Sequence, residues 1–148
     1  MPAVSQGSSP GNVSSPTTRF ARVDDETIGR LVDEFYVRIR HDPVLGPVFE
    51  AVIAPEAWPK HLATMRDFWS SVMLTSGRYK GNPLAVHSRV EGLGPELFEP
   101  WLVLFAQTAD ELFEEEFAAI FREKAGRIAQ SIRIGLFYRP EFDRPRAV

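Results

Sequence analysis

The sequence contains no cysteine and only three histidines among its 148 residues. The absence of cysteine excludes disulfide bonds, thiolate metal ligands and thiol nucleophiles, and it is compatible with a reducing compartment. No stretch of about 18 consecutive apolar residues is present, so we expect no membrane-spanning helix and no membrane partner. The net charge of −3 argues against nucleic acid as a partner, because phosphate backbones are bound by clustered Lys and Arg.

Several functional motifs are also missing. The amino terminus has no basic stretch followed by an apolar one, which favours a cytoplasmic location over a secreted one. There is no glycine-rich phosphate-binding loop. No histidine has a glutamate three positions before it, as the motif of di-iron helical bundles requires. We therefore expect neither a nucleotide-binding enzyme nor a di-iron protein.

Apolar residues recur at three- and four-residue intervals over most of the chain, which predicts an all-α fold. Long helices are expected over residues 24–40, 55–75 and 116–137, and another from residue 94 or 95 onward. A short 3₁₀ turn is expected within 43–49 and a short helix over 84–90. Residues 21–138 are expected to form one domain, preceded by a disordered Ser/Pro/Gly-rich extension (1–20) and followed by a flexible tail (139–148).

Two of the histidines, His61 and His87, lie in different helical patterns, and the turn-rich segment 76–83 separates them. One imidazole above and one below a flat ligand, each on its own helix, is how a helical protein holds haem. Taken singly, each has an ordinary interpretation. His61 lies on an apolar helix face and would then be a hydrogen-bonded core residue, whereas His87 would be a surface residue on a short helix.

Other side chains are candidates for the same site. Tyr36 and Trp101 each carry a polar group on an aromatic body, and such groups seek hydrogen-bond partners when they are buried. If both reach the same space as His61, they supply donors to a small bound ligand; otherwise they are ordinary core residues. Arg78, Tyr79 and Lys80 are candidates for contacts with carboxylates such as haem propionates, although charged residues in a turn usually face solvent.

These residues and their neighbours resemble group III of the truncated haemoglobins over about residues 25–138. The paired glycines typical of groups I and II are missing. The resemblance is carried by a series of motifs in the order of the family: Phe35-Tyr36, Asp42-Pro43, Leu45-Gly46-Pro47 with Phe49, Trp58 with His61, Phe68-Trp69, Tyr79 with Gly81, Pro83-Leu84 with His87, Phe98, Trp101-Leu102 and Leu104-Phe105.

The resemblance implies a shortened globin fold, a two-over-two helical sandwich that encloses haem b. It implies that His87 is the proximal iron ligand, and that Tyr36, His61 and Trp101 form the distal pocket, where a gas would bind. The other residues that we expect to contact the haem are Phe35, Phe49, Leu62, Met65, Trp69, Arg78, Tyr79, Leu84 and Phe98, together with Trp101.

From this we expect a haem protein that binds oxygen and other diatomic gases. Redox chemistry of oxygen, peroxide or nitric oxide is a further expectation, and it would require an electron-donating reductase as a partner. Two alternatives stay open at this point. The protein could be a haem-based sensor or carrier without turnover, or a helical interaction module that binds no haem.

Overall fold

The computed structural model describes residues 18–137, so most of the expected extension and the whole expected tail lie outside the described residues. The predicted all-α fold is confirmed. Within this range, no helix is long and apolar enough to cross a membrane. The helices are α2 (Asp25–His41), α3 (Leu45–Val52), α4 (Trp58–Leu74), α5 (Pro83–Ser88), α6 (Phe98–Leu112) and α7 (Glu115–Phe137), and short 3₁₀ segments η1 (Pro55–Ala57) and η2 (Pro95–Leu97) precede α4 and α6.

Local sequence signals account for the ends of α2. The side chain of Asp24 accepts a hydrogen bond from the Thr27 N–H, and the Thr27 hydroxyl accepts one from the Asp24 N–H, which is a reciprocal capping box. The helix ends at His41, and Asp42 is extended because it precedes Pro43. This helix therefore lies within one residue of the predicted range.

The predicted 3₁₀ turn within residues 43–49 is wrong, because this segment belongs largely to the α-helix α3. The Asp42 carboxylate accepts hydrogen bonds from the Val44 and Leu45 N–H groups, which have no partner within the helix. Pro47 occupies the first turn of α3, where its missing N–H costs no hydrogen bond. Pro43 precedes α3 and Pro47 fits its first turn, so neither proline prevents an α-helix here.

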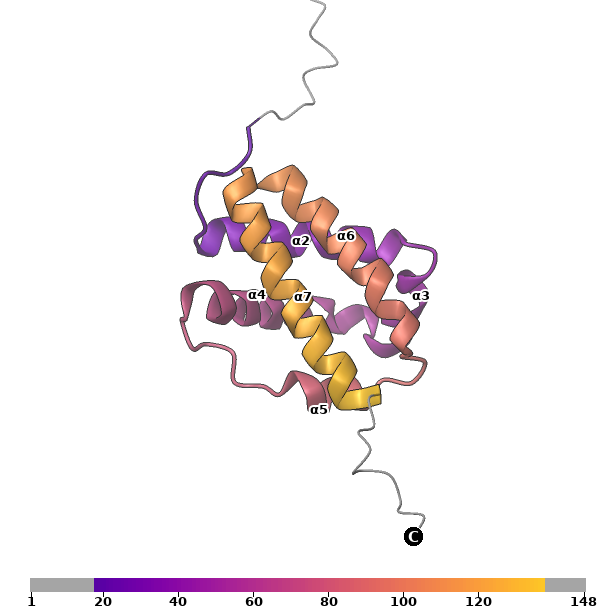
Figure 1. The fold of residues 1–148 in the computed structure, drawn as a ribbon. Coiled ribbons are helices and arrows are strands. Elements are labelled where there is room, and N and C mark those ends of the chain that lie inside the picture. The colour runs from indigo at the N-terminus through magenta and orange to yellow at the C-terminus, as the bar shows by residue number, and fades with distance from the viewer. Residues whose placement is uncertain (1–17, 138–148) are drawn as a thin grey trace, which may run out of the picture.

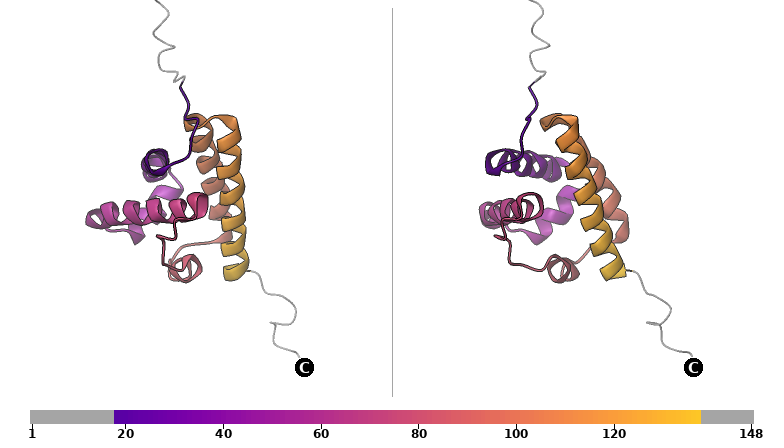
Figure 2. Two further views of the ribbon diagram at one scale, coloured as in Figure 1. Left: turned by 90° about the vertical axis from the view of Figure 1, so that its left-hand side faces the viewer. Right: turned by 60° about the vertical axis from the view of Figure 1, so that its left-hand side comes forward.

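The helices form two layers that cross each other. Helices α6 and α7 run side by side in one layer, and α2 and α4 form the other (Figures 1 and 2). Helix α3 packs against α2, and the short α5 lies near the carboxyl end of α7 (Figure 1). This is the predicted two-over-two arrangement, and it leaves α5 as a separate short element below α4 (Figure 2).

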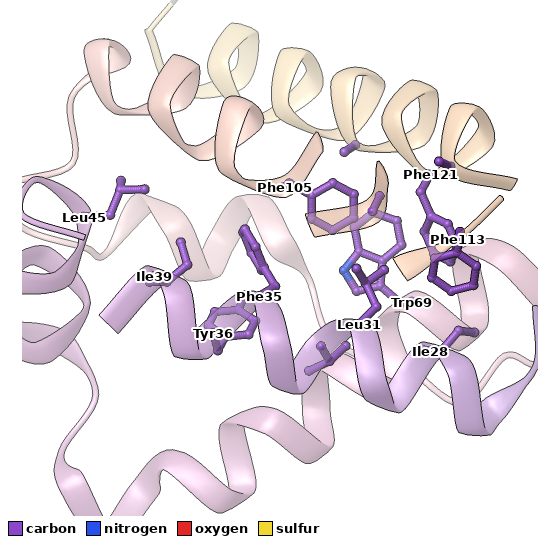
Figure 3. Packing of buried hydrophobic residues seen from close by; sticks show 14 of the residues in the cluster. Ile28, Leu31, Phe35, Tyr36, Ile39, Leu45, Trp69, Phe105, Phe113 and Phe121 are labelled. Carbon is purple, nitrogen blue, oxygen red and sulfur yellow. The ribbon is translucent and has the colours of Figure 1, made fainter. Parts of the chain in front are cut away.

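Aromatic side chains join the two layers (Figure 3). Phe105 of α6 stacks on Trp69 of α4 with ring centroids 4.9 Å apart, and on Trp101 of its own helix at 5.6 Å. Phe35 of α2 makes edge-to-face contacts with Trp101 and Phe105. Trp69, Phe105 and Phe35 are each at most 3% exposed, so this cluster forms the centre of the core.

Phe20 is partly buried and packs against the core, although it is the last residue of the expected extension. Its N–H donates to the Leu112 carbonyl, and its own carbonyl accepts from the Glu114 N–H. Its ring packs edge to face on Phe113 with centroids 5.4 Å apart. The domain boundary expected after residue 20 therefore falls inside a packed segment, because the backbone and ring of Phe20 contact residues 112–114.

One glycine is required by the close approach of α3 to the end of α2. A Cβ atom added at Gly46 would lie 2.8 Å from the Arg40 carbonyl oxygen, which is closer than real Cβ contacts. The obstacle is backbone and has no flexible side chain that could move aside. Gly126, in contrast, lies within α7, and outside the adjoining backbone of that helix no atom lies within 4 Å of an added Cβ.

These two glycines provide a matched pair of stability variants. We expect Gly46→Ala to lower the free energy of unfolding by about 1–3 kcal/mol, because the methyl group forces the α2–α3 junction apart. Gly126→Ala should raise it by about 0.4–1 kcal/mol, since alanine restricts the unfolded chain and fits the helix. Urea unfolding followed by circular dichroism measures both values. Equal effects of the two substitutions would contradict the close approach at Gly46.

Candidate functional site

A largely apolar cavity of about 290 Å³ lies between the two layers. This volume is near the lower end of the range of about 300–1,000 Å³ that is typical of small-molecule sites. All six α-helices of residues 18–137 contribute to its walls. The lining residues are Tyr36, Leu45, Val48, Phe49, Val52, Ile53, His61, Thr64, Met65, Phe68, Trp69, Tyr79, Pro83, Val86, His87, Val90, Leu93, Leu97, Phe98, Trp101, Ile128, Ala129 and Ile132.

His87 reaches this cavity from α5. The Asn82 side chain caps the helix by accepting a hydrogen bond from the Ala85 N–H, and Pro83 occupies the first helical position. The His87 Nδ1 atom lies 2.7 Å from the Pro83 carbonyl oxygen. Because a carbonyl only accepts, Nδ1 must donate, and the neutral ring then carries its lone pair on Nε2. An imidazole oriented in this way is prepared to bind a metal through Nε2.

His61 lines the same cavity from α4. Its Nε2 atom is shielded from solvent and has no hydrogen-bond partner. Burial lowers the pKa of His61 below its ordinary value, and the nearby His87 lowers that pKa further by charge repulsion. Both effects favour the neutral form of His61. An unpaired buried polar atom in a largely apolar cavity wall is a candidate ligand contact.

Tyr36 is 5% exposed, and its ring is held by aromatic neighbours. The ring makes edge-to-face contacts with Phe35 and His61, with centroids 5.0 and 5.1 Å apart. The hydroxyl group donates a hydrogen bond to the Met65 sulfur at 3.1 Å. Burial raises the pKa of Tyr36 well above its ordinary value, so the hydroxyl group stays protonated and remains a donor.

Most of the side chains predicted for the site meet at this cavity. Tyr36 and His61 do so, and Trp101 lies on the opposite layer, where its stacking on Phe105 fixes the indole. His87 adds the imidazole of α5. The further predicted residues that line the cavity are Phe49, Met65, Trp69, Tyr79 and Phe98.

Four of the predicted haem contacts do not line the cavity. Phe35 is buried behind Trp101, and Leu62 packs on the core beside the cavity. Leu84 is 40% exposed and lies against Gly135 of α7. Their haem contacts therefore stay predictions.

Arg78 is the fourth of these residues, and its guanidinium group has protein partners. It donates to the Asp25 carboxylate at 2.6 Å and to the Ser70 hydroxyl at 2.7 Å, and it lies 3.6 Å from Asp67. These contacts connect the segment after α4 to α2 and to α4 itself. The predicted propionate contact of Arg78 stays a prediction, and it would compete with these ion pairs.

Two walls of the cavity were missed by the sequence analysis. Helix α3 contributes Val48 and Val52 in addition to Phe49, and helix α7 contributes Ile128, Ala129 and Ile132. The apolar spacing of these residues was visible in the sequence. It indicates a buried helix face, however, and the same spacing serves equally for packing on a neighbouring helix or for lining a cavity.

The residues of the cavity fit a haem group. A haem needs a flat apolar space, a neutral imidazole with a free Nε2 atom, and few competing polar groups. His87 provides the imidazole and its orienting hydrogen bond, and the walls are mostly aliphatic and aromatic. The unpaired Nε2 of His61 provides a buried polar group that is available to a further ligand. The donor set therefore agrees with the predicted cofactor.

Comparisons with known proteins agree with this arrangement. No family model matches the chain. The chain is 32% identical over 121 residues to the protein named Group 3 truncated hemoglobin ctb of Campylobacter jejuni subsp. jejuni serotype O:2. The aligned region covers 80% of this chain and 95% of that protein. The crystal structure of group III truncated hemoglobin from Campylobacter jejuni matches with a TM-score of 0.77 and 32% identity, covering 81% of this chain and 96% of that chain.

The fold and these matches define the class of the protein as a shortened globin. The chain belongs to the group III truncated haemoglobins, which confirms the predicted family. Haem binding and a globin function in general follow from this membership.

Proposed function

We propose that the protein binds haem b through His87 and holds oxygen or another diatomic gas in a polar distal pocket formed by Tyr36, His61 and Trp101. The observation that carries this proposal is the pair of imidazoles in one apolar cavity. His87 is oriented by the Pro83 carbonyl, and the Nε2 atom of His61 lacks a partner. When bound, the haem supplies an iron with an open coordination position for gas binding and electron transfer.

The role of His87 follows from its local hydrogen bond. The Pro83 carbonyl fixes the tautomer and the direction of the ring, so that the nitrogen carrying the lone pair is the one free to coordinate. The hydrogen bond also increases the electron density of the imidazole, which strengthens it as a ligand. Helix α5 is only six residues long. The direction of the His87 ring is therefore set by contacts within this helix and its cap, namely the Pro83 hydrogen bond and the Asn82 side chain.

The distal residues supply directed hydrogen bonds in a largely apolar cavity. The buried Tyr36 hydroxyl stays protonated and donates, because its raised pKa prevents ionisation near neutral pH. His61 is neutral, so it offers one N–H and one lone pair. Hydrogen-bond donors that are already oriented stabilise the charge that develops on a ligand. Their interaction with that charge is stronger where water is excluded. Such a pocket favours ligands with negative charge on their outer atom.

The same distal polarity suits redox chemistry of oxygen, peroxide or nitric oxide, and this is the finer part of the proposal. Turnover would require an electron-donating reductase, which we propose as a partner together with the gas. A cytoplasmic location is likewise proposed from the sequence. A sensor or carrier would use the same pocket without a reductant, so turnover with an electron donor separates the two cases.

His87→Ala tests the proposed iron ligand. We expect affinity for haem to fall more than about tenfold, because losing the ligand costs more than losing one of its outer-shell partners. His41→Ala is the matched control: His41 makes the same type of hydrogen bond to the Val37 carbonyl, at 2.9 Å, but lies exposed outside the cavity. Haem titration followed by the Soret band measures both. Equal retention of haem by the two variants would contradict the assignment.

Tyr36→Phe tests the distal donor. The substitution removes the hydroxyl group and keeps the aromatic contacts, so we expect oxygen to dissociate about threefold to tenfold faster from the haem-loaded protein. Carbon monoxide dissociation should change little, because this ligand is a weak hydrogen-bond acceptor. Stopped-flow ligand replacement gives both rates. An unchanged oxygen dissociation rate would show that the Tyr36 hydroxyl does not reach the ligand.

A further inference from the structure

Met65 is the residue of the cavity wall that accepts a hydrogen bond from the proposed distal donor, Tyr36. It lies on α4, four residues after His61, and its sulfur accepts the hydrogen bond of the Tyr36 hydroxyl at 3.1 Å. A thioether sulfur is a weak acceptor. The Met65 side chain also lines the cavity. The Tyr36 hydroxyl group therefore lies next to both the Met65 sulfur and the space that a ligand would occupy.

The Tyr36 ring has little freedom to move. Phe35, Phe49, Trp58 and His61 all lie against it, with ring centroids between 5.0 and 6.0 Å away. Rotation of the whole side chain would disrupt these contacts in a closely packed environment. The O–H bond, however, rotates about the C–O bond without displacing any heavy atom. The hydroxyl proton is therefore the part of Tyr36 that changes direction.

We propose that the Met65 sulfur is a competing acceptor that holds the Tyr36 O–H when no strong acceptor occupies the cavity, and that it thereby sets how strongly the site prefers polar ligands. This inference rests on the proposed function for its ligands. A ligand with a negatively charged outer atom outcompetes the sulfur and captures the proton. A ligand that accepts weakly leaves the proton on Met65 and gains nothing from Tyr36.

The surroundings of Tyr36 support this role. His61 is its edge-to-face neighbour, and the His61 Nε2 atom has no partner, yet the hydroxyl group is directed to the sulfur. A stronger acceptor at position 65 would hold the proton against a ligand, and an aliphatic side chain would leave it without a partner. The Met65 thioether is intermediate between these two cases. Its sulfur accepts the hydrogen bond weakly, so a stronger acceptor in the cavity can take the Tyr36 proton from it.

Met65→Leu removes the acceptor and approximately conserves the side-chain volume. In the haem-loaded protein, we expect oxygen to dissociate about twofold to fivefold more slowly, because the Tyr36 proton no longer has a competing partner. Oxygen gains more negative charge in a ferrous site than carbon monoxide does, so the carbon monoxide rate should change less than twofold. In the Tyr36→Phe background, Met65→Leu should leave the oxygen rate unchanged.

Met73→Leu is the matched control, because Met73 lies on the same helix and packs against the core without lining the cavity. It should change neither rate. Equal changes for oxygen and carbon monoxide, or the same Met65→Leu effect with and without the Tyr36 hydroxyl, would overturn the proposal. Either result would show that Met65 acts only as part of the wall.

The hydrogen bond itself is tested without haem by a double-mutant cycle on the thermal unfolding midpoint. We expect Tyr36→Phe and Met65→Leu to be non-additive by about 3 °C in the haem-free protein, since each removes the same bond. Additive effects would overturn the proposed bond. A protein that takes up no haem would contradict both the proposed function and the proposed ligand preference. Non-additive unfolding midpoints would in that case still support the Tyr36–Met65 hydrogen bond.

Discussion

The stack of Trp69, Phe105 and Trp101 is the contact on which the geometry of the cavity depends. Phe105 lies between the two indoles, with interplanar angles of 15° and 7°, so one side chain links α4 of the first layer to α6 of the second. Rigid aromatic rings set the separation of the layers and resist collapse. Trp69 and Trp101 also face the cavity, so the contact that joins the layers forms two of its walls.

The two imidazoles are positioned by different means. His61 lies on the long helix α4, two turns before Trp69, and therefore follows the packing of the layers. His87 lies on the short helix α5, and its ring direction is fixed by the Pro83 carbonyl of the same helix. Distortion of the core would thus move His61 directly, whereas the direction of the His87 ring depends mainly on a bond within one helical turn.

Sequence reasoning succeeded where the information is local and failed where it is not. The Asp24 cap and Pro43 delimit α2, so its range could be predicted within one residue. The meeting of Tyr36, His61 and Trp101 came from the family resemblance, since no spacing rule brings residues of three helices together. Arg78 shows the limit clearly: its partner Asp25 is 53 residues away, and a cation in a turn gives no sign of such a partner.

Buried polar side chains differ in whether a protein group satisfies them. Thr27, Ser70 and Thr108 are fully buried, and each makes a hydrogen bond within the protein. Within residues 18–137, the buried side-chain nitrogens without a partner are Trp58 Nε1 and His61 Nε2, and both rings adjoin Tyr36. An unpaired buried polar group costs about 1–3 kcal/mol. Of these two nitrogens, Trp58 Nε1 belongs to the buried core and does not reach the cavity, whereas His61 lines the cavity wall. His61 Nε2 is therefore the unpaired buried nitrogen that a molecule in the cavity could contact.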